Sequence, residues 1–481
     1  MNRRHLIAAL AAAPLLPALA RAGDAPSPAD LRGDIAILRA ALALHPGLYR
    51  YATPPQVTAR IAALETAFAA SVTLEQRYLL LSRFLATIRC GHSYGNFFNQ
   101  KKAVAAALFD RPSRLPFHFR WIAGEMIVIA QGGADLPAGS VITAINGVAP
   151  RMMLDRLMPY ARADGHNDAK RRSLLEVRGA DSIEYFDVFH GLLFGVPRGG
   201  VHHVAARLAG GRSVALDLPA IDLAARRAQT TQRDYRGSAP VWDWIIRPDG
   251  IAVLTMPGWA LYDSKWDWRA WLTARLDSLA GAKGLIIDLR ENEGGEDCGD
   301  MILARLIASP IVEPGAERRV RYRRTPPTLD RYLDTWDDSF RTLGEGATPL
   351  RDGFFRLEGD TADSSIAPVA RQIKLPVAAL IGPVNSSATF GFAASARRSG
   401  KVRLFGETTG GNQRGINGGR FFFVRLPASG LEFDLPLIGY YPPGAPPDAG
   451  LAPDVAVAST AADIAAGRDP VLAAAAAWIA G

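Results

Sequence analysis

The sequence has few cysteines and no long apolar run beyond its N-terminus. Cys90 and Cys298 are the only cysteines among 481 residues, which excludes a disulfide-dense scaffold. They leave open either one disulfide or two buried free thiols. Four Cys and His ligands at usable spacing are also lacking, so we expect no metal site. No window after the N-terminal segment holds about 18 uninterrupted apolar residues, which excludes a later transmembrane helix.

Clustered positive charge and internal repeats are lacking as well. The net charge is +8, but the arginines are scattered singly and in short pairs, and no Lys/Arg cluster is interleaved with aromatic residues. We therefore expect no nucleic-acid partner. What remains is an ordinary globular composition, with 48% hydrophobic and 21% charged residues. A chain of this length and composition can bury a large core and should form two or three domains.

Residues 1–22 have the pattern of a signal peptide. Arg3 and Arg4 precede an apolar run of about 14 residues that two prolines interrupt, and small residues follow at 20–22. The alternative is a membrane anchor, but the run is shorter than the roughly 20 residues that span a bilayer. We predict a signal of the twin-arginine type and a mature chain from about Gly23 that is periplasmic or secreted.

Three regions follow the predicted signal peptide. Residues 23–110 repeat apolar positions at i, i+3, i+4 and i+7, which predicts a helical region. Residues 111–240 alternate short strand patterns with turns and predict a β-rich module. Residues 241–481 alternate buried-strand and helix patterns and predict an α/β core, with a polar excursion at 312–367 that covers it.

Short, wholly apolar runs mark the strands of this predicted core. They occur at 251–256, 284–289 and 377–382, each of a length and composition typical of strands buried on both faces. A helical pattern separates the first two runs, and further helical patterns follow the second and third. The fold class is therefore α/β, with a mainly parallel sheet.

Two serines stand where the last of these strands gives way to a helix. The pattern predicts a helix over residues 387–399, with Gly400 after its end and Ser386 and Ser387 at its start. Serines in this position usually cap the helix, so the alternative to a nucleophile is a cap. Gly294 and Gly295 follow the strand at 284–289. Ligand sites in α/β sheets form at the carboxyl ends of strands, and glycine lets backbone N–H groups face a bound oxygen.

A serine nucleophile needs a base, and His92 is the strongest candidate. His92 lies between glycines in a loop directly after a long apolar helix. The other histidines lie in the signal segment, in helix ends, in strands or in polar loops without other chemically active residues, where surface or packing roles are expected.

Several stretches together resemble the C-terminal processing, or tail-specific, serine proteases. The stretches are "GLIIDLRENEGG", "SSATFGFAASARRSGKVRLFGETTGG" and "GLAPDVAV", with "HPGLYRY" and "IRCGHSYGNF" upstream. The upstream pair is similar to the tricorn-like branch, in which a histidine from the N-terminal loop is the base. The resemblance covers nearly the whole mature chain and implies a crotonase-like core.

The resemblance implies a role for each matching residue. Ser387 falls on the nucleophile, His92 on the base, and the N–H groups of Ala388 and of Gly294 or Gly295 on the oxyanion hole. The lysine-dependent branch of the family is excluded, because the chain has Thr-Gly-Gly-Asn where that branch has its lysine pattern.

Asp448 is the nearest acid before the Pro-Asp step of "GLAPDVAV", and we expect it to orient His92. If His92 reaches Ser387, then Cys90 and Cys298 belong to loops around one site. The resulting hypothesis is a Cys90–Cys298 disulfide that fastens the N-terminal loop to the core.

The stretch "LPAGSVITAINGVAP" is similar to the end of a PDZ-like domain, which in this family often holds a substrate's C-terminus. We interpret the β-rich module as PDZ-like, and a simple packing domain is the alternative. The sequence therefore predicts an exported serine peptidase that acts on peptides or unfolded proteins without metal or cofactor. The alternatives are an inactive binder of peptides or apolar ligands on the same scaffold, and a crotonase-like thioester enzyme.

Overall fold

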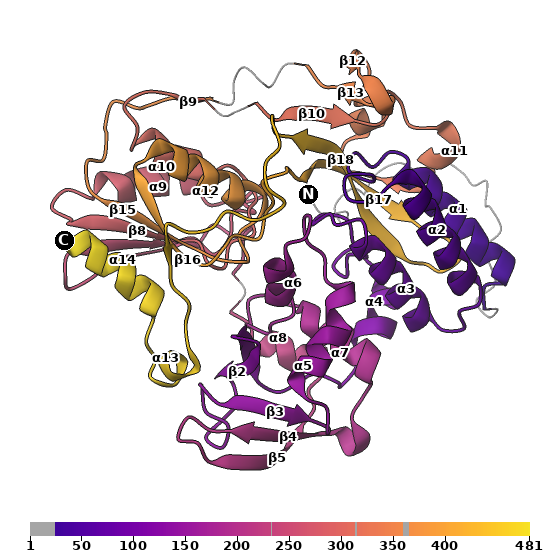
Figure 1. Cartoon of the computed structure of the whole chain (residues 1–481), viewed down its shortest axis with the longest axis horizontal. Coiled ribbons are helices and arrows are strands. Elements are labelled where there is room, and N and C mark those ends of the chain that lie inside the picture. The colour runs from indigo at the N-terminus through magenta and orange to yellow at the C-terminus, as the bar shows by residue number, and fades with distance from the viewer. Residues whose placement is uncertain (1–24, 232, 313–314, 359–364) are drawn as a thin grey trace.

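The computed structural model describes residues 25–231, 233–312, 315–358 and 365–481. The predicted signal peptide lies outside these residues. Figure 1 shows the N-terminal helices on one side, the parallel sheet with the C-terminus on the other, and the β-rich module below them. No helix in the described ranges is long and apolar enough to cross a membrane.

The N-terminal region is helical, as predicted. Ser27, Thr53 and Thr73 begin the first three helices, and each closes a capping box with the residue three positions later. The third helix leads directly into the loop that carries His92. The helices are α1 (Pro28–Leu42), α2 (Pro54–Ala69), α3 (Leu74–Ala86) and α4 (Lys102–Phe109).

The β-rich module contains one antiparallel sheet with the strand order β1-β2-β3-β4-β5. Helices fill the long connections after β3 and β5, and one of them, α6, points back toward the parallel sheet (Figure 1). The strands are β1 (His118–Ile122), β2 (Glu125–Ala130), β3 (Val141–Ile145), β4 (Val201–Arg207) and β5 (Ser213–Pro219). The helices are α5 (Pro150–Leu157), η2 (Met158–Tyr160), α6 (Asp168–Leu174), α7 (Tyr185–Phe194), η3 (Arg198–Gly200) and α8 (Leu223–Ala228).

The predicted parallel sheet is confirmed, with the strand order β19-β16-β15-β8-β7-β6. Every neighbouring pair is parallel except β6 and β7. Alternate strand residues face α9, α10 and α12 on one side and α14 on the other, so both faces are buried. The strands are β6 (Asp243–Ile246), β7 (Ile251–Thr255), β8 (Gly284–Asp288), β15 (Val377–Ile381), β16 (Val402–Gly406) and β19 (Val455–Ala456). The helices are α9 (Trp268–Asp277), α10 (Gly299–Ala304), α12 (Ser387–Ser399), α13 (Ala461–Ala465) and α14 (Pro470–Ala480).

The polar excursion at 312–367 is more than a cover over the core. Its short strands join β17 and β18 in a second six-stranded sheet, with the order β11-β17-β18-β10-β13-β12. A separate two-stranded ladder pairs β14 with β9. The second sheet contains β10 (Glu317–Val320), β11 (Leu333–Asp334), β12 (Thr348–Pro349), β13 (Phe355–Arg356), β17 (Asn417–Arg425) and β18 (Glu432–Tyr441). The remaining elements are β9 (Ile311–Val312), α11 (Pro327–Asp330), η4 (Asp338–Thr342), η5 (Arg351–Gly353) and β14 (Ser365–Ile366).

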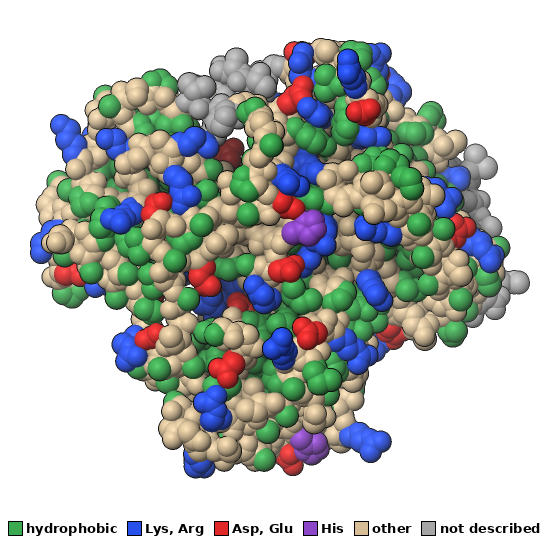
Figure 2. All heavy atoms as spheres, viewed as in Figure 1, with side chains coloured by type: hydrophobic (Ala, Val, Ile, Leu, Met, Phe, Trp, Pro, Cys, Tyr) green, Lys and Arg blue, Asp and Glu red, His purple; other side chains and the backbone are tan. Residues whose placement is uncertain are grey.

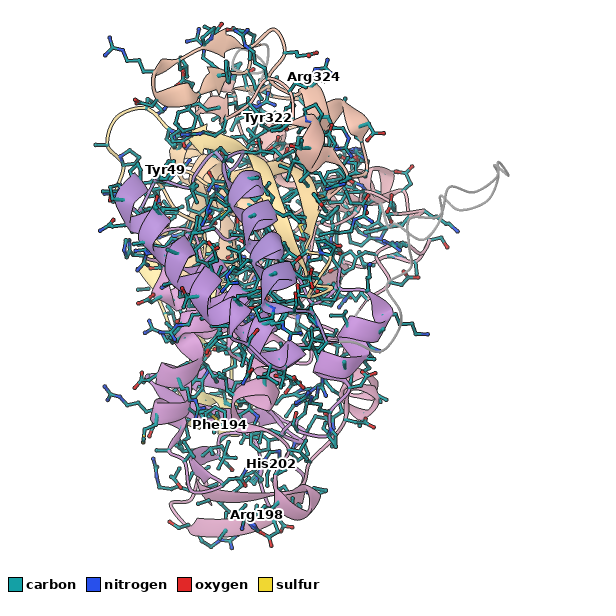
Figure 3. All side chains as sticks on the ribbon, turned by 90° about the vertical axis from the view of Figure 1, so that its right-hand side faces the viewer. Tyr49, Phe194, Arg198, His202, Tyr322 and Arg324 are labelled. Carbon is teal, nitrogen blue, oxygen red and sulfur yellow. The ribbon has the colours of Figure 1, made fainter. Side chains whose placement is uncertain are left out.

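One hydrophobic cluster joins the N-terminal helices, the β-rich module and the second sheet. It includes Leu38 of α1, Phe119 of β1, Tyr322 and Phe422 of β17. Figure 3 shows the long N-terminal helices in front of the pale strands of this sheet, with Tyr322 labelled above them. The sheet forms because the aromatic side chains of the excursion and of β17 need an apolar partner, which the N-terminal helices supply.

Candidate active site

Ser387 is the first residue of α12 and has a strained backbone. Its φ of +52° lies in the left-handed region, which costs a serine of the order of 1–3 kcal/mol and persists only where the surroundings fix it. The predicted helix over 387–399 and its Gly400 C-cap are confirmed. Ser386 occupies the N-cap position, but no side chain caps the helix, and its hydroxyl donates instead to the carbonyl of Glu293 at 3.1 Å. The cap interpretation is therefore wrong for both serines.

Asn385 fixes the turn that presents Ser387. Its side-chain Oδ1 accepts from the Gly382 N–H at 2.7 Å, and its Nδ2 donates to the Asn292 carbonyl at 3.0 Å. Its own carbonyl accepts from the N–H groups of Gly410 and Gly411 at 2.7 and 3.0 Å. Three loops thus converge on one buried amide residue.

The glycine loop after β8 lies directly against this turn. Gly294 and Gly295 have φ values of +112° and +141°, which only glycine adopts easily. A Cβ on Gly294 would lie 2.9 Å from the Ala388 nitrogen and 3.0 Å from the Ser387 Cβ. The two loops that we expected to form an oxyanion hole are therefore in contact.

The hydrogen bonds of this loop distinguish between the two glycines. The Gly294 N–H donates to the Asn292 Oδ1 at 2.8 Å within the same loop, so it is not free to bind an oxyanion. Ala388 is the second residue of α12, where helix N–H groups have no partner within the helix. The candidate oxyanion donors are therefore the N–H groups of Gly295 and Ala388. Gly294 lets the loop turn with a positive φ and leaves no side chain against Ser387.

His92 lies in the loop after α3 and packs against the second sheet. A Cβ on Gly418 of β17 would lie 3.7 Å from its Cε1 atom, and the Phe421 ring centroid is 5.9 Å away. Desolvation lowers the pKa of His92 below its usual 6.5, and the carboxylate of Asp164 opposes this shift. The ring is therefore neutral at neutral pH, as a general base requires. The described contacts include no hydrogen bond between His92 and Ser387, and the His92 Nδ1 has no partner among them.

Asp164 is a residue that the sequence analysis missed. Its Oδ1 accepts from the Gly91 N–H at 2.8 Å, and a Cβ on Gly91 would lie 2.6 Å from its Oδ2. The carboxylate thus holds the backbone immediately before His92, and the glycine at position 91 is needed to admit it. No local sequence pattern marks Asp164, because it is separated from His92 by some 70 residues and is brought there by the fold.

Asp448 does not orient His92 in this structure. Its Oδ2 lies 2.5 Å from the Nδ1 of His166, and its Oδ1 accepts from the Asn412 Nδ2 at 2.7 Å. The carboxylate is already shared by these two groups, so the expected role toward His92 is wrong. The structure instead pairs Asp448 with a half-exposed histidine that the sequence analysis set aside.

The predicted Cys90–Cys298 disulfide is also wrong. Both thiols are free and buried. Cys90 packs in the cluster of the N-terminal helices, and Cys298 packs in the cluster of the parallel sheet. Burial raises the pKa of Cys90 to about 11, so the thiol is unreactive at neutral pH. Of the two alternatives, the structure supports two packing residues.

A cavity lies beside the site, and the charges on the face seen in Figure 2 are mixed. In the ranges that the structure describes, no group of three or more His, Cys, Asp or Glu side chains could hold a metal ion. Figure 2 shows Lys and Arg side chains scattered among acidic and apolar ones over the visible face. A cavity of about 270 Å³ lies beside the site, between β1 and the ends of β8 and β15. Pro383 and Val384 line it but Ser387 and His92 do not, so it is a neighbour of the site and not its centre.

Residues 250–457 match the model of Peptidase family S41. No curated protein matches the chain. A solved structure of mature CPAF complexed with lactacystin is similar over 94% of this chain and 97% of that chain, with 15% identity and a TM-score of 0.62. Another structure of mature CPAF covers 91% and 94%, with 15% identity and a TM-score of 0.59. A putative peptidase from Parabacteroides merdae covers 95% and 97% at 16% identity, but its TM-score of 0.44 supports no argument.

Proposed function

We propose that this chain, which carries a peptidase family S41 domain and is thereby a hydrolase of the serine peptidase class, cleaves peptide bonds through an acyl-enzyme on Ser387. The observation that carries the proposal is the backbone of Ser387. A strained serine at a helix start, with its hydroxyl free of any capping role and a glycine loop against its Cβ, has the geometry of a nucleophile beside an oxyanion hole.

In the proposed mechanism, neutral His92 accepts the proton of Ser387 Oγ while this oxygen attacks the substrate carbonyl. The N–H groups of Gly295 and Ala388 donate to the developing oxyanion. Protonated His92 then gives its proton to the leaving amine, and a water molecule activated in the same way hydrolyses the acyl-enzyme. Each step uses groups of this chain and water alone. The scheme requires His92 and Ser387 to come within hydrogen-bond reach, roughly 2.6–3.2 Å, when the peptide is bound.

Ser387→Ala should abolish covalent labelling by a serine-directed phosphonate, because the attacking oxygen is removed. Ser386→Ala should still be labelled, since its hydroxyl bonds the Glu293 carbonyl and is not the attacking group. Mass spectrometry of the labelled peptide reads out both variants. Labelling of Ser387→Ala at an unchanged rate would end the proposal.

A second candidate is a peptide-binding protein on the same scaffold that has little or no turnover. The observation that favours it is the His92 Nδ1, which has no orienting partner within the described residues. Turnover of an unstructured peptide by the unmodified protein rejects this candidate. The thioester alternative is dropped, because residues 250–457 match a peptidase family.

The finer architecture and the location belong to the same proposal. We propose a crotonase-like core for residues 241–481, a PDZ-like module for 111–240 and a helical region for 23–110. The antiparallel sheet of β1 to β5 and the parallel sheet with α12 support this division, although one hydrophobic cluster crosses the first boundary. Export rests on the pattern of residues 1–22, and peptides or unfolded proteins are the proposed substrates.

A further inference from the structure

A short segment of the β-rich module, residues 162–170, contacts the loops of the proposed active site, and its last three residues form the start of α6. We call it the connector. Its Arg162 donates to the Gly91 carbonyl next to His92, and its Asp164 accepts from the Gly91 N–H. Its last residue, Lys170, reaches the two loops that carry the nucleophile and the oxyanion donors. The connector therefore relates parts of the site that are some two hundred residues apart in sequence.

Lys170 makes the central contact of the connector. Its side chain is only 3% exposed, and its ammonium group donates to the Glu293 carboxylate and, at 2.9 Å, to the Val384 carbonyl. Glu293 directly precedes Gly294, and Val384 lies three residues before Ser387. One ammonium group thus joins the oxyanion loop to the nucleophile turn.

A second cation strengthens this junction. Arg162 lies 3.5 Å from the other carboxylate oxygen of Glu293, and Arg162 is largely buried. Although desolvation opposes ionisation, the charges of Lys170 and Arg162 lower the pKa of Glu293 to about 2. Glu293 is therefore ionised at neutral pH, and removing its charge would leave the buried ammonium group of Lys170 without its carboxylate partner.

The two loops that Lys170 joins both carry backbone strain. Ser387 and the pair Gly294 and Gly295 have positive φ values, and strained segments keep their conformation only where the surroundings hold them. The Ser386 hydroxyl also donates to this loop, but to the backbone carbonyl of Glu293 and not to its side chain. Lys170 adds a contact from the β-rich module to the hydrogen bonds that Asn385 and Thr389 make between the same two loops.

On the basis of the function proposed above, we propose that Lys170 is a positioning residue, which holds the N–H groups of Gly295 and Ala388 at the separation that an oxyanion requires. Lys170 is not a base in this scheme, because its ammonium group already donates to Glu293 and Val384. Misplacing catalytic groups by about 1 Å can cost on the order of 100-fold in rate, so a looser junction should reduce kcat and leave substrate binding nearly intact.

The test compares Lys170→Met with Lys283→Met, which removes an exposed lysine at the opposite end of β8. Lys170→Met should lower kcat about 10- to 100-fold with KM within about threefold. It should also lower the affinity for a peptide-aldehyde inhibitor by a similar factor, because the oxygen of the hemiacetal that the aldehyde forms with Ser387 occupies the oxyanion hole. Lys283→Met should change neither quantity. Lys170→Arg keeps the positive charge and should recover part of the loss.

Glu293→Gln gives an independent measure, because its side chain is half exposed and the amide has nearly the same shape. It should lower kcat in the same range, and the double variant Lys170→Met/Glu293→Gln should lose no more than the worse single variant. Additive losses, or a Glu293→Gln variant with unchanged kcat and aldehyde affinity, would refute the positioning role in an active enzyme. Unmodified protein without turnover or phosphonate labelling would instead refute the proposed function, and the positioning role with it.

Discussion

At the scale of single residues, two histidines are candidates for the proposed general base, His92 and His166. His166 has the carboxylate partner that a catalytic histidine often has, but it is half exposed and packs its ring edge against Tyr51 at 5.7 Å. Among the described residues His92 has no such partner, but it lies close enough to Glu293, which directly precedes the glycine loop beside Ser387, for that carboxylate to raise its pKa. His92 is therefore the better placed of the two. Asp164 raises its pKa and holds the backbone of Gly91 next to it.

His92→Ala should lower kcat/KM by at least about 100-fold, because general base catalysis contributes on this scale. His166→Ala should remain within about threefold of the unmodified protein. The comparison is made with one unstructured peptide at saturating and limiting concentrations. A larger loss of kcat/KM in His166→Ala than in His92→Ala would instead indicate that His166, paired with Asp448, is the base.

The pH profile gives a second check on the same residue. Desolvation lowers the pKa of His92, so the ring stays neutral to lower pH than usual, and the acid limb of kcat/KM should lie below about pH 6.5. Asp164 raises the pKa of His92, so Asp164→Asn should move the limb to still lower pH. A limb above pH 7 in the unmodified protein would contradict the assignment.

At the scale of elements, the site depends on two loops that start from adjacent parallel strands. β8 and β15 are paired in register from Leu285 with Val377 to Asp288 with Leu380, so their carboxyl ends lie side by side. The glycine loop leaves one end and the serine turn leaves the other. Their contact is a direct result of this register, because a shift of one strand would separate them.

Gly294→Ala should abolish activity, because the added methyl group would lie between Ser386, Ser387 and Ala388 in the proposed oxyanion space. We expect a loss of at least about 100-fold in kcat. Gly346→Ala is the matched control, since Gly346 also has a positive φ, of +77°, but no atom within 4 Å of the added Cβ. Both variants should lose some thermal stability, and only Gly294→Ala should lose activity.

At the scale of the whole molecule, the loop of His92 is held by a strand from the far end of the chain. Asp434 of β18 accepts from the side-chain amides of Asn96 at 2.7 Å and of Asn99 at 3.0 Å. Its own N–H donates to the Tyr94 carbonyl. These contacts join the N-terminal region to the second sheet and so bring His92 toward the C-terminal half.

Asp434 should make the stability depend on pH. Desolvation raises its pKa from 3.8 to about 7, against the hydrogen bonds of Asn96 and Asn99. The protonated form is therefore favoured in the folded state, so this contribution is fully present below pH 3.8 and is lost as the pH rises through about 7. The free energy of unfolding of the unmodified protein, minus that of Asp434→Asn, should fall by a few kcal/mol over this range. A difference that is constant with pH, measured by urea unfolding, would show that Asp434 does not titrate in this way.

The sequence by itself determined many of the helices and strands and indicated the region of the proposed nucleophile. Apolar runs of strand length predicted β7, β8 and β15, apolar periodicity predicted the N-terminal helices, and Gly400 predicted the end of α12, because each of these signals is local. The family resemblance, which residues 250–457 support, then singled out Ser387 and the glycine loop.

Only the tertiary structure decided which side chains meet around these elements. It pairs Asp448 with His166, leaves Cys90 and Cys298 as separate buried thiols, and brings Asp164 and Lys170 from the module to the site. It also turns the polar excursion into a second sheet. These contacts join residues that are tens to hundreds of positions apart, and their energies depend on burial and on neighbouring charges, which local sequence patterns do not contain.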